Sequence, residues 1–354
     1  MRVRTVPASA LESGHVHAWC ELQAADPTLS SPFLAPEFTL AVAQERPDVA
    51  VGLVEEEGRP VGFFPYQRSR FATGRPVGGT LNDLQGVVAA PGVEIAAADL
   101  IRDCGLLHWQ FSRVIASQAP FAPCHVRADV SHFIDLGGGF EAYARTKHDT
   151  FGERLLRKGR KLEREAGPVR FELHSGDSSA LAQLMAWKSD RYGRAGYADV
   201  FRSRWARRVI ERIHATQTGR FAGQLSLLWA GDRMAAAHLG IRCLDRWHSW
   251  FISYAPPFAR YSPGLLLYWK LAESAAGAGV QRIEIGGGDY PYKAMLANTS
   301  MRVAGGSVDR IAIVTAARRW SEKRKESIRG SSVLRPPARM FLRTYRRMLR
   351  SGVK

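Results

Sequence analysis

The pattern of apolar and polar residues predicts strands and helices in the same order in both halves of the chain. In the first half, apolar runs at 48–55 and 60–68 flank Glu56-Glu57-Gly58, a pattern typical of a hairpin. A strand and turn at 80–89 follow, then a helix over 93–104 and a buried strand over 106–111. The order is therefore three strands, a helix and a strand.

The second half repeats this order. Strands at 224–230, 233–242 and 247–254 predict an antiparallel meander, and a helix over 263–277 leads into a strand over 281–286. The last two elements predict a βαβ crossover. The duplication is inferred from element order alone, and it indicates an α+β fold with a mixed sheet. We expect two tandem domains, each a mostly antiparallel sheet with a βαβ crossover and flanking helices.

Glycines and a basic helix mark the joint between the halves. A loop over 120–129 and a strand over 132–136 precede Gly137-Gly138-Gly139, and a long helix over 140–166 ends at Gly167-Pro168. The helix is either a solvated surface helix or a contact for a polyanion such as a carrier phosphate, RNA or a lipid headgroup. Its basic residues are Arg145, Lys147, Arg154, Arg157, Lys158, Arg160, Lys161 and Arg164. We expect a first domain over 1–136, a connecting helix over 137–168, a second domain over 169–316 with a final hairpin at 301–314, and a tail over 317–354.

Charge is concentrated in the tail. The chain has a net charge of +17, and residues 317–354 hold 13 Lys or Arg against two Glu. Such a tail either binds RNA, DNA or an anionic membrane surface, or is simply solvated. The start MRVRTV has no apolar core of a signal peptide, and no uncharged apolar run is long enough to span a membrane. We expect a cytoplasmic protein whose tail could reach the inner face of the membrane.

Composition favours a packed core and argues against a zinc site or a disulfide framework. Hydrophobic residues make up 45% of the 354 residues, which is enough for a packed core and argues against global disorder. The four cysteines are scattered without CxxC or His/Cys spacing, so neither a zinc site nor a disulfide framework is indicated.

The stretch over 260–293 holds the strongest functional pattern. Ser262 suits a helix N-cap and Pro263 the first helical position, so the following N–H groups could bind a phosphate or pyrophosphate. A second strand then leads to a Gly-rich turn with Asp289, and Lys293 lies one helical turn further on. A phosphate site beside an acid and a base suggests transfer of a group from a phosphorylated carrier.

Each catalytic candidate has a structural alternative. Asp289 could accept a proton from the attacking amine or hydroxyl, or cap the short helix over 290–297. Lys293 could stabilise an oxyanion or bind an acidic substrate, or form a surface ion pair. Tyr292, like Tyr290, could protonate a leaving thiolate, although one of the two is expected to be a packed aromatic. His238 is more typical of a buried core histidine than of a base facing the cleft.

Two residues of the first half could reach the same cleft. Asp83 and Gln85, in the sequence NDLQG, are candidates for substrate binding, with a turn residue and a solvated amide as the alternative. No Ser or Cys stands in a recognisable triad context, so an acyl-enzyme is not indicated.

The second half resembles the GNAT superfamily of acyltransferases, on the residues SYAPPFARYSPGLLLYWKL. Arg260 stands for the basic residue of the acyl-carrier motif and Gly264 for a surviving glycine, whereas Pro263 and Leu265 depart from its usual two-glycine loop. The pieces RLLRKGRKLEREAGPVRFEL, PGLLLYWKLAE and GGGDYPYK, with PVGFFPYQRS and NDLQGVV in the first half, are similar to the CelD/BcsL-type acetyltransferases. The resemblance covers roughly residues 45 to 310, and Fem-type aminoacyl transferases are related.

The resemblance implies two GNAT-like domains and an acyl-CoA co-substrate, with no metal. The carrier would lie in a V between splayed strands at 247–254 and 281–286, and the pyrophosphate would meet N–H groups near Ser262. The implied carrier-binding residues are Tyr254, Arg260, Tyr261, Ser262, Gly264 and Leu265.

Several activities remain open from the sequence. The first is transfer of an acetyl or longer acyl group to an amine or hydroxyl of a sugar, polysaccharide precursor or small metabolite. The alternatives are an aminoacyl-tRNA-dependent transferase and a non-catalytic scaffold that binds polyanions. The oligomeric state is left open.

Overall fold

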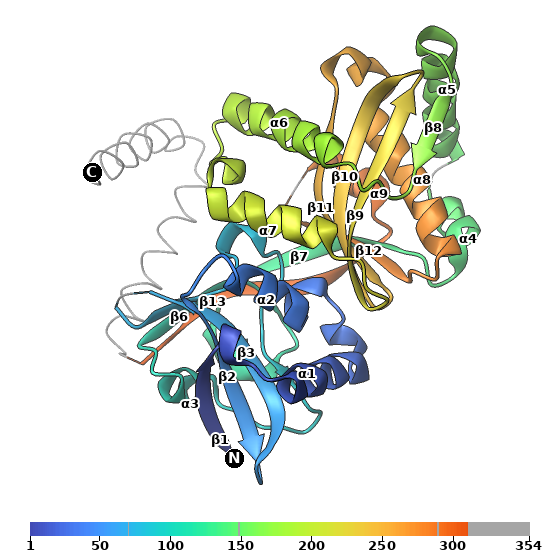
Figure 1. The fold of residues 1–354 in the computed structure, drawn as a ribbon. Coiled ribbons are helices and arrows are strands. Elements are labelled where there is room, and N and C mark those ends of the chain that lie inside the picture. Colours follow the sequence, from blue (N-terminus) through green and yellow to red (C-terminus); the bar gives the residue numbers. More distant parts are fainter. Residues whose placement is uncertain (70, 148, 289, 311–354) are drawn as a thin grey trace, which may run out of the picture.

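One mixed sheet runs through both halves of the protein (Figure 1). The computed structural model describes residues 1–310 except 70, 148 and 289. The strands are β1 (Arg2–Pro7), β2 (Val49–Glu56), β3 (Arg59–Arg68), β4 (Thr73–Arg75), β5 (Val88–Ala89), β6 (His108–Ile115), β7 (His125–Asp135), β8 (Val169–Glu172), β9 (Phe221–Ala230), β10 (Arg233–Cys243), β11 (Arg246–Tyr254), β12 (Arg282–Gly287) and β13 (Thr299–Asp309). The α-helices are α1 (Ser13–Ala25), α2 (Pro36–Ala43), α3 (Ala97–Asp103), α4 (Gly139–Arg145), α5 (Asp149–Ala166), α6 (Ser178–Ala195), α7 (Arg204–Ala215), α8 (Pro263–Gly277) and α9 (Pro291–Leu296).

The strand order shows how the halves are joined. The sheet runs β1-β2-β3-β4-β6-β13-β7-β12-β11-β10-β9-β8, with β5 on β3. β4 pairs in parallel with β6, and β11 with β12, so each half has one parallel pair with a helix in its crossover, α3 or α8. The remaining pairs are antiparallel. This confirms the predicted α+β class with a large mixed sheet.

Three local predictions were wrong. The basic segment forms two helices, α4 and α5, instead of one. The loop expected over 120–129 is strand from His125 onward. The first part of β7 pairs with β13, and its last part pairs with β12. The described part of the expected hairpin at 301–314 is one strand, β13, placed between β6 and β7. The domain boundaries at 136 and 169 stay a prediction.

Two cores lie on opposite faces of the second-half strands. On one face, α6 and α7 share a core with α1, α2 and β2 of the first half. On the other face, α8 packs on β9–β12, with α4 and α5 against α8. The described helices include none that is long and apolar enough to cross a membrane.

The position of β13 predicts that it is required for folding. A chain of residues 1–298 would leave β6 and β7 with open edges and remove the buried Val303 and Val308. We expect this chain to aggregate or unfold without a cooperative transition, whereas 1–310 unfolds cooperatively. Circular dichroism during thermal unfolding checks this, and a cooperative transition of 1–298 near that of 1–310 would contradict it.

Candidate active site

The parallel strands β11 and β12 separate after a short paired segment. They pair only from Arg246 to His248 and from Arg282 to Glu284. Each strand carries a register shift just beyond, because β11 has one extra residue opposite Leu239/Gly240 of β10 and β12 has one opposite β7. Such bulges bend a strand away from its neighbour. The two strands therefore diverge in a V beyond the paired segment.

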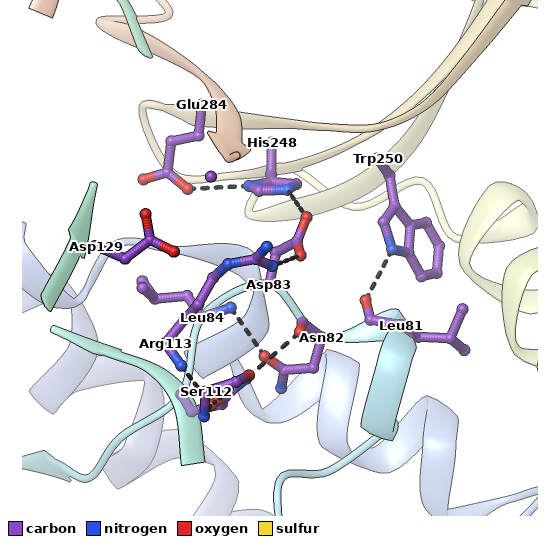
Figure 2. A network of polar contacts seen from close by, with 12 residues as sticks. Leu81, Asn82, Asp83, Leu84, Ser112, Arg113, Asp129, His248, Trp250 and Glu284 are labelled. Carbon is purple, nitrogen blue, oxygen red and sulfur yellow. Dashed lines mark hydrogen bonds and ion pairs between the residues drawn. The ribbon is translucent and has the colours of Figure 1, made fainter. Parts of the chain in front are cut away.

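A charged network lies at the point where the strands separate (Figure 2). His248 Nδ1 is 3.2 Å from Glu284 Oε2, and His248 Nε2 is 3.2 Å from Asp83 Oδ2. Asp83 also pairs with Arg113 of β6. Although burial lowers the pKa of His248, its bonds to the two carboxylates raise that pKa above the ordinary value. The two carboxylates therefore stabilise the cationic form of His248, and through them His248 joins the two halves of the chain.

Asp83 itself stays ionised. Burial alone would raise its pKa, but the hydrogen bond and charge of His248, with the charges of Arg113 and Lys293, lower it to about 2. Its side chain retains 31% of its exposed surface, so it can still meet a ligand. Such an acid is too weak a base to accept a proton readily at neutral pH, and it can instead hold a cationic group.

The loop that carries Asp83 is fixed from both sides. Trp250 Nε1 donates to Leu81 O at 2.8 Å, which ties the loop to β11. Gln85 Oε1 accepts the backbone N–H groups of Ser112 (2.8 Å) and Arg113 (3.0 Å), which ties it to β6. Gln85 is buried and its amide is occupied in this way, so the structure gives it a positioning role and not the expected contact with substrate.

Lys293 lies buried beside this network. Its side chain in α9 donates from Nζ to Gly287 O, and 5% of the residue is exposed. Burial, only partly offset by Asp83, lowers the pKa of Lys293 to about 8. A Cβ atom on Gly286 would lie 3.3 Å from Asp83 Oδ2 and 3.7 Å from Lys293 Nζ, so both groups converge over that glycine. Asp289, the expected base, lies outside the described residues.

The two tyrosine candidates and His238 differ in how deeply they are buried. Tyr292 stacks on Tyr268 with ring centroids 6.2 Å apart, and burial raises its pKa to about 12. Tyr290 is 47% exposed. His238 has no exposed surface, binds Ser249 Oγ at 2.9 Å, and has a pKa that burial lowers to about 3. His238 is thus a neutral core residue in this structure, which leaves it no contact with an acceptor.

Helix α6 supplies two cations that the sequence analysis missed. Lys188 Nζ donates to Ile252 O at 3.3 Å, on the part of β11 that β12 no longer pairs with. Burial, with the neighbouring charges of Arg191 and Lys293, lowers the pKa of Lys188 to about 8. The Arg191 guanidinium lies over the ring of Tyr254, 5.2 Å from its centroid. The V is therefore lined by cations on its α6 side.

The start of α8 differs from the expected cap. Ser262 occupies the N-cap position with φ +54°, but its side chain caps no N–H group. Its hydroxyl instead accepts from Lys158 Nζ of α5 at 2.7 Å. The N–H groups of Leu265 and Leu266 donate to Ser262 O. A positive charge from α5 therefore stands at this helix start, and the carrier-phosphate interpretation of the basic helix stays a prediction.

The other carrier candidates divide into two groups. Arg260 Nη2 and Tyr261 OH both bind Glu165 Oε2, so they anchor α5 to the α8 start. Gly264 packs beside Tyr254, because an added Cβ atom would lie in van der Waals contact with the tyrosine ring, at 3.7 Å. The half-buried Leu265 follows it in the first turn of α8.

Sequence reasoning missed His248, Glu284, Arg113 and the two α6 cations. His248 and Glu284 did carry a signal, since each is a titratable residue inside an otherwise apolar strand predicted to be buried. Nothing in the sequence paired them with Asp83. Across residues 1–310, apart from the three positions not described, no cluster of His, Cys, Asp or Glu side chains could hold a metal ion.

Known proteins share both the sequence pattern and the fold. Residues 151–294 match the family model described as an acetyltransferase (GNAT) domain. No curated protein sequence matches the chain significantly.

Three solved structures have a similar fold. FemX matches with a TM-score of 0.58 and 8% identity, over 88% of this chain and 97% of FemX. The C-terminal DUF2156 domain of a putative lysylphosphatidylglycerol synthetase from Agrobacterium fabrum matches with a TM-score of 0.52 and 13% identity. The match covers 85% of this chain and 93% of that domain. A tandem GNAT protein from the clavulanic acid biosynthesis pathway matches with a TM-score of 0.51 and 14% identity. The match covers 87% of this chain and 98% of that protein.

These identities support the fold alone, and the narrower CelD/BcsL-type resemblance stays a prediction. The family match covers α5 to α9, the segment that contains β11, β12 and the α8 start. Residues 151–294 are therefore similar to an acetyltransferase domain of the GNAT type, in a fold like that of tandem GNAT proteins.

Proposed function

We propose that the protein transfers an acyl group from acyl-CoA to an amine or hydroxyl of a sugar, polysaccharide precursor or small metabolite. The observation that carries this proposal is the separation of β11 from β12 beside a helix start with a lysine on it. An opening between strands offers unpaired backbone groups to a pantetheine arm. A cation at a helix N-terminus offers a place for the pyrophosphate.

The carrier would lie between the separated strands in one direction. The pantetheine arm would follow the free edge of β11 past Ile252, displacing the Lys188 side chain from the carbonyl. The pyrophosphate would lie at Gly264 and Lys158, with the exposed basic residues of α5 beyond it. The thioester would then lie near the point where the strands part, beside His248 and Lys293.

The chemistry follows from these positions. The lone pair of the acceptor amine or hydroxyl attacks the thioester carbonyl carbon, and the carbonyl oxygen becomes an oxyanion. Lys293, cationic below pH about 8, stabilises that charge. The C–S bond then breaks, and Tyr292 can protonate the thiolate because its high pKa keeps the phenol protonated at neutral pH. Asp83 holds a cationic acceptor, and Asp289 remains our candidate for the base.

Lys158 offers a direct check of carrier binding. We expect Lys158→Gln to weaken acetyl-CoA binding about tenfold, because one charge-assisted hydrogen bond to a phosphate is lost. Lys270→Gln is the matched control, since Lys270 is an exposed lysine of α8 and pairs only with Glu273 among the described residues. Calorimetric titration measures both. Equal affinities in the two variants would contradict the placement of the pyrophosphate.

The exposed basic face of α5 favours a second candidate, an aminoacyl-tRNA-dependent transferase. The structural similarity to FemX is compatible with it. Binding of tRNA with a steep salt dependence, together with no binding of acyl-CoA, would favour this candidate. Acyl transfer that survives deletion of residues 317–354 would favour the first. If that deletion abolished binding to nucleic acids and membranes, and the protein bound no acyl-CoA, a non-catalytic scaffold that binds polyanions would be favoured.

A further inference from the structure

A pocket lies on the sheet at the start of the β11–β12 pair, where it shares Glu284 with the charged network around His248. It has a volume of about 430 Å³ and is lined by β11, β12, β13, the end of β6 and the segment 27–31 of the first half. Three arginines line it, Arg246, Arg282 and Arg302, against one carboxylate, Glu284. That carboxylate already binds His248, so the pocket is strongly positive.

The two strand arginines lie side by side, and Arg246 Nη2 donates one long hydrogen bond, to Pro27 O at 3.5 Å. Arg246 and Arg282 are direct register partners in adjacent parallel strands. Like charges placed opposite each other destabilise a sheet unless an anion lies between them. Arg246 is only 8% exposed, and its nearest carboxylate oxygen, Asp245 Oδ1, is 3.6 Å away. The Arg282 guanidinium rests on the ring of Phe133, and its Nε is buried without a hydrogen-bond partner in the described structure.

A buried hydroxyl in the same pocket has no partner either. Ser31 is 2% exposed, and its Oγ makes no hydrogen bond to any group that the structure describes. Burying a polar atom without a partner costs free energy, so such atoms commonly mark a place where a ligand or ion completes the bonding. Arginine forks and a hydroxyl donor together suit the tetrahedral oxygens of a phosphate group.

We propose that this pocket binds the phosphate group of a small phosphorylated organic molecule, with Arg246, Arg282 and Ser31 as its donors. Arg302, exposed at the edge of the pocket, adds attraction from outside. Ile115 and Met301 also line the pocket and leave an apolar wall for the organic part. The site is separate from the α8 start, and it does not depend on which group the V-shaped opening transfers.

The test compares anions on the full-length protein. Calorimetric titration with inorganic phosphate, phenyl phosphate and succinate at constant ionic strength measures affinity for wild type and variants. We expect phosphate to bind, phenyl phosphate to bind more tightly, and succinate to bind weakest. No phosphate binding by the wild type, or tighter binding of succinate, would overturn the proposal.

The variants assign the binding to this pocket. Ser31→Ala removes a hydroxyl that makes no hydrogen bond within the described residues, so the fold should be unaffected while phosphate affinity falls several-fold. Arg282→Gln should lower it about tenfold or more. Arg170→Gln is the matched control, because Arg170 also rests on an aromatic ring, Trp229, but lies outside the pocket. Lys158→Gln should leave phosphate binding in place. Unchanged phosphate affinity in Ser31→Ala and Arg282→Gln, or its loss in Lys158→Gln alone, would refute the site.

Discussion

Replacing Lys293 by Met is expected to lower acyl transfer by about 10²–10³-fold while acetyl-CoA still binds. Removal of one preorganised oxyanion donor has an effect of this size in other enzymes. Methionine keeps the length and the apolar stem of lysine, so packing in α9 is largely retained. A thiol-release assay with a reactive acceptor amine, alongside calorimetry with acetyl-CoA, separates the loss of chemistry from the loss of binding.

Lys147 provides the matched control for this variant. It is 9% exposed, donates from Nζ to Ala297 O at 2.6 Å, and has a pKa that burial also lowers to about 8. Lys147→Met should therefore have a similar cost in stability and leave turnover nearly unchanged. If both variants lose activity equally, Lys293 acts through stability and not through the oxyanion.

The ionisation of Lys293 should also make the rate of acyl transfer depend on pH. A pKa of about 8 means that Lys293 is cationic below that pH and neutral above it. Its contribution to the rate should be present at pH 7 and decline as the pH rises through about 8. The Lys293→Met variant should lack that decline.

Replacing Asp83 by Asn is expected to lower both activity and stability. His248 and Arg113 would each lose a charged partner across the boundary between the halves. Removing one partner of a fully buried ion pair costs about 3–5 kcal/mol. Because Asp83 keeps 31% of its side-chain exposure, we expect about 2 kcal/mol in the free energy of unfolding. Turnover should fall about 10–100-fold through a higher KM for a cationic acceptor and a displaced His248.

Asp48 is the control for Asp83. It binds Arg46, Arg75 and Gln67 in the first half, 22% of its side chain is exposed, and its pKa is also lowered by these partners although burial opposes them. Asp48→Asn should destabilise the protein without a change in KM. Urea unfolding measures the stability of the two variants, and steady-state kinetics measures their KM for the acceptor. An unchanged KM in Asp83→Asn would show that Asp83 does not bind the acceptor.

The Asp83 contribution to stability also has a definite sign with pH. Its pKa in the folded protein, about 2, is below the ordinary carboxyl value. The stabilisation is therefore fully present above pH about 4 and declines as the pH falls towards 2. Asp83→Asn should flatten that part of the pH profile of unfolding.

Local patterns predicted the second half well because its strands and helices are contiguous. The helix over 263–277 has the expected bounds, and the three meander strands lie within three residues of theirs, since turn signals and apolar periodicity mark the ends. The position of β13 could not be predicted, because an insertion between β6 and β7 is decided by pairing over about two hundred residues of chain. Its 11-residue strand looks locally like half of a hairpin.

The site was predictable only in part. Lys293 and Asp83 stood out through their neighbours in the sequence, and the structure brings both over Gly286. His248 and Lys158 act through partners that are 165 and 104 residues away. Gln85 and His238 are polar residues whose hydrogen bonds lie within the core, which their sequence context does not reveal.

The central claim is that an acyl-CoA lies between β11 and β12 with its pyrophosphate at the start of α8. Calorimetric titration of acetyl-CoA and longer acyl-CoAs into wild type and Gly264→Glu tests it most directly. A glutamate there would place a negative charge beside Tyr254 at the start of α8 and repel the phosphates. The account predicts binding by wild type and loss of binding in the variant with an unchanged melting temperature. Equal binding in both proteins, or no binding of any acyl-CoA to wild type, would contradict it.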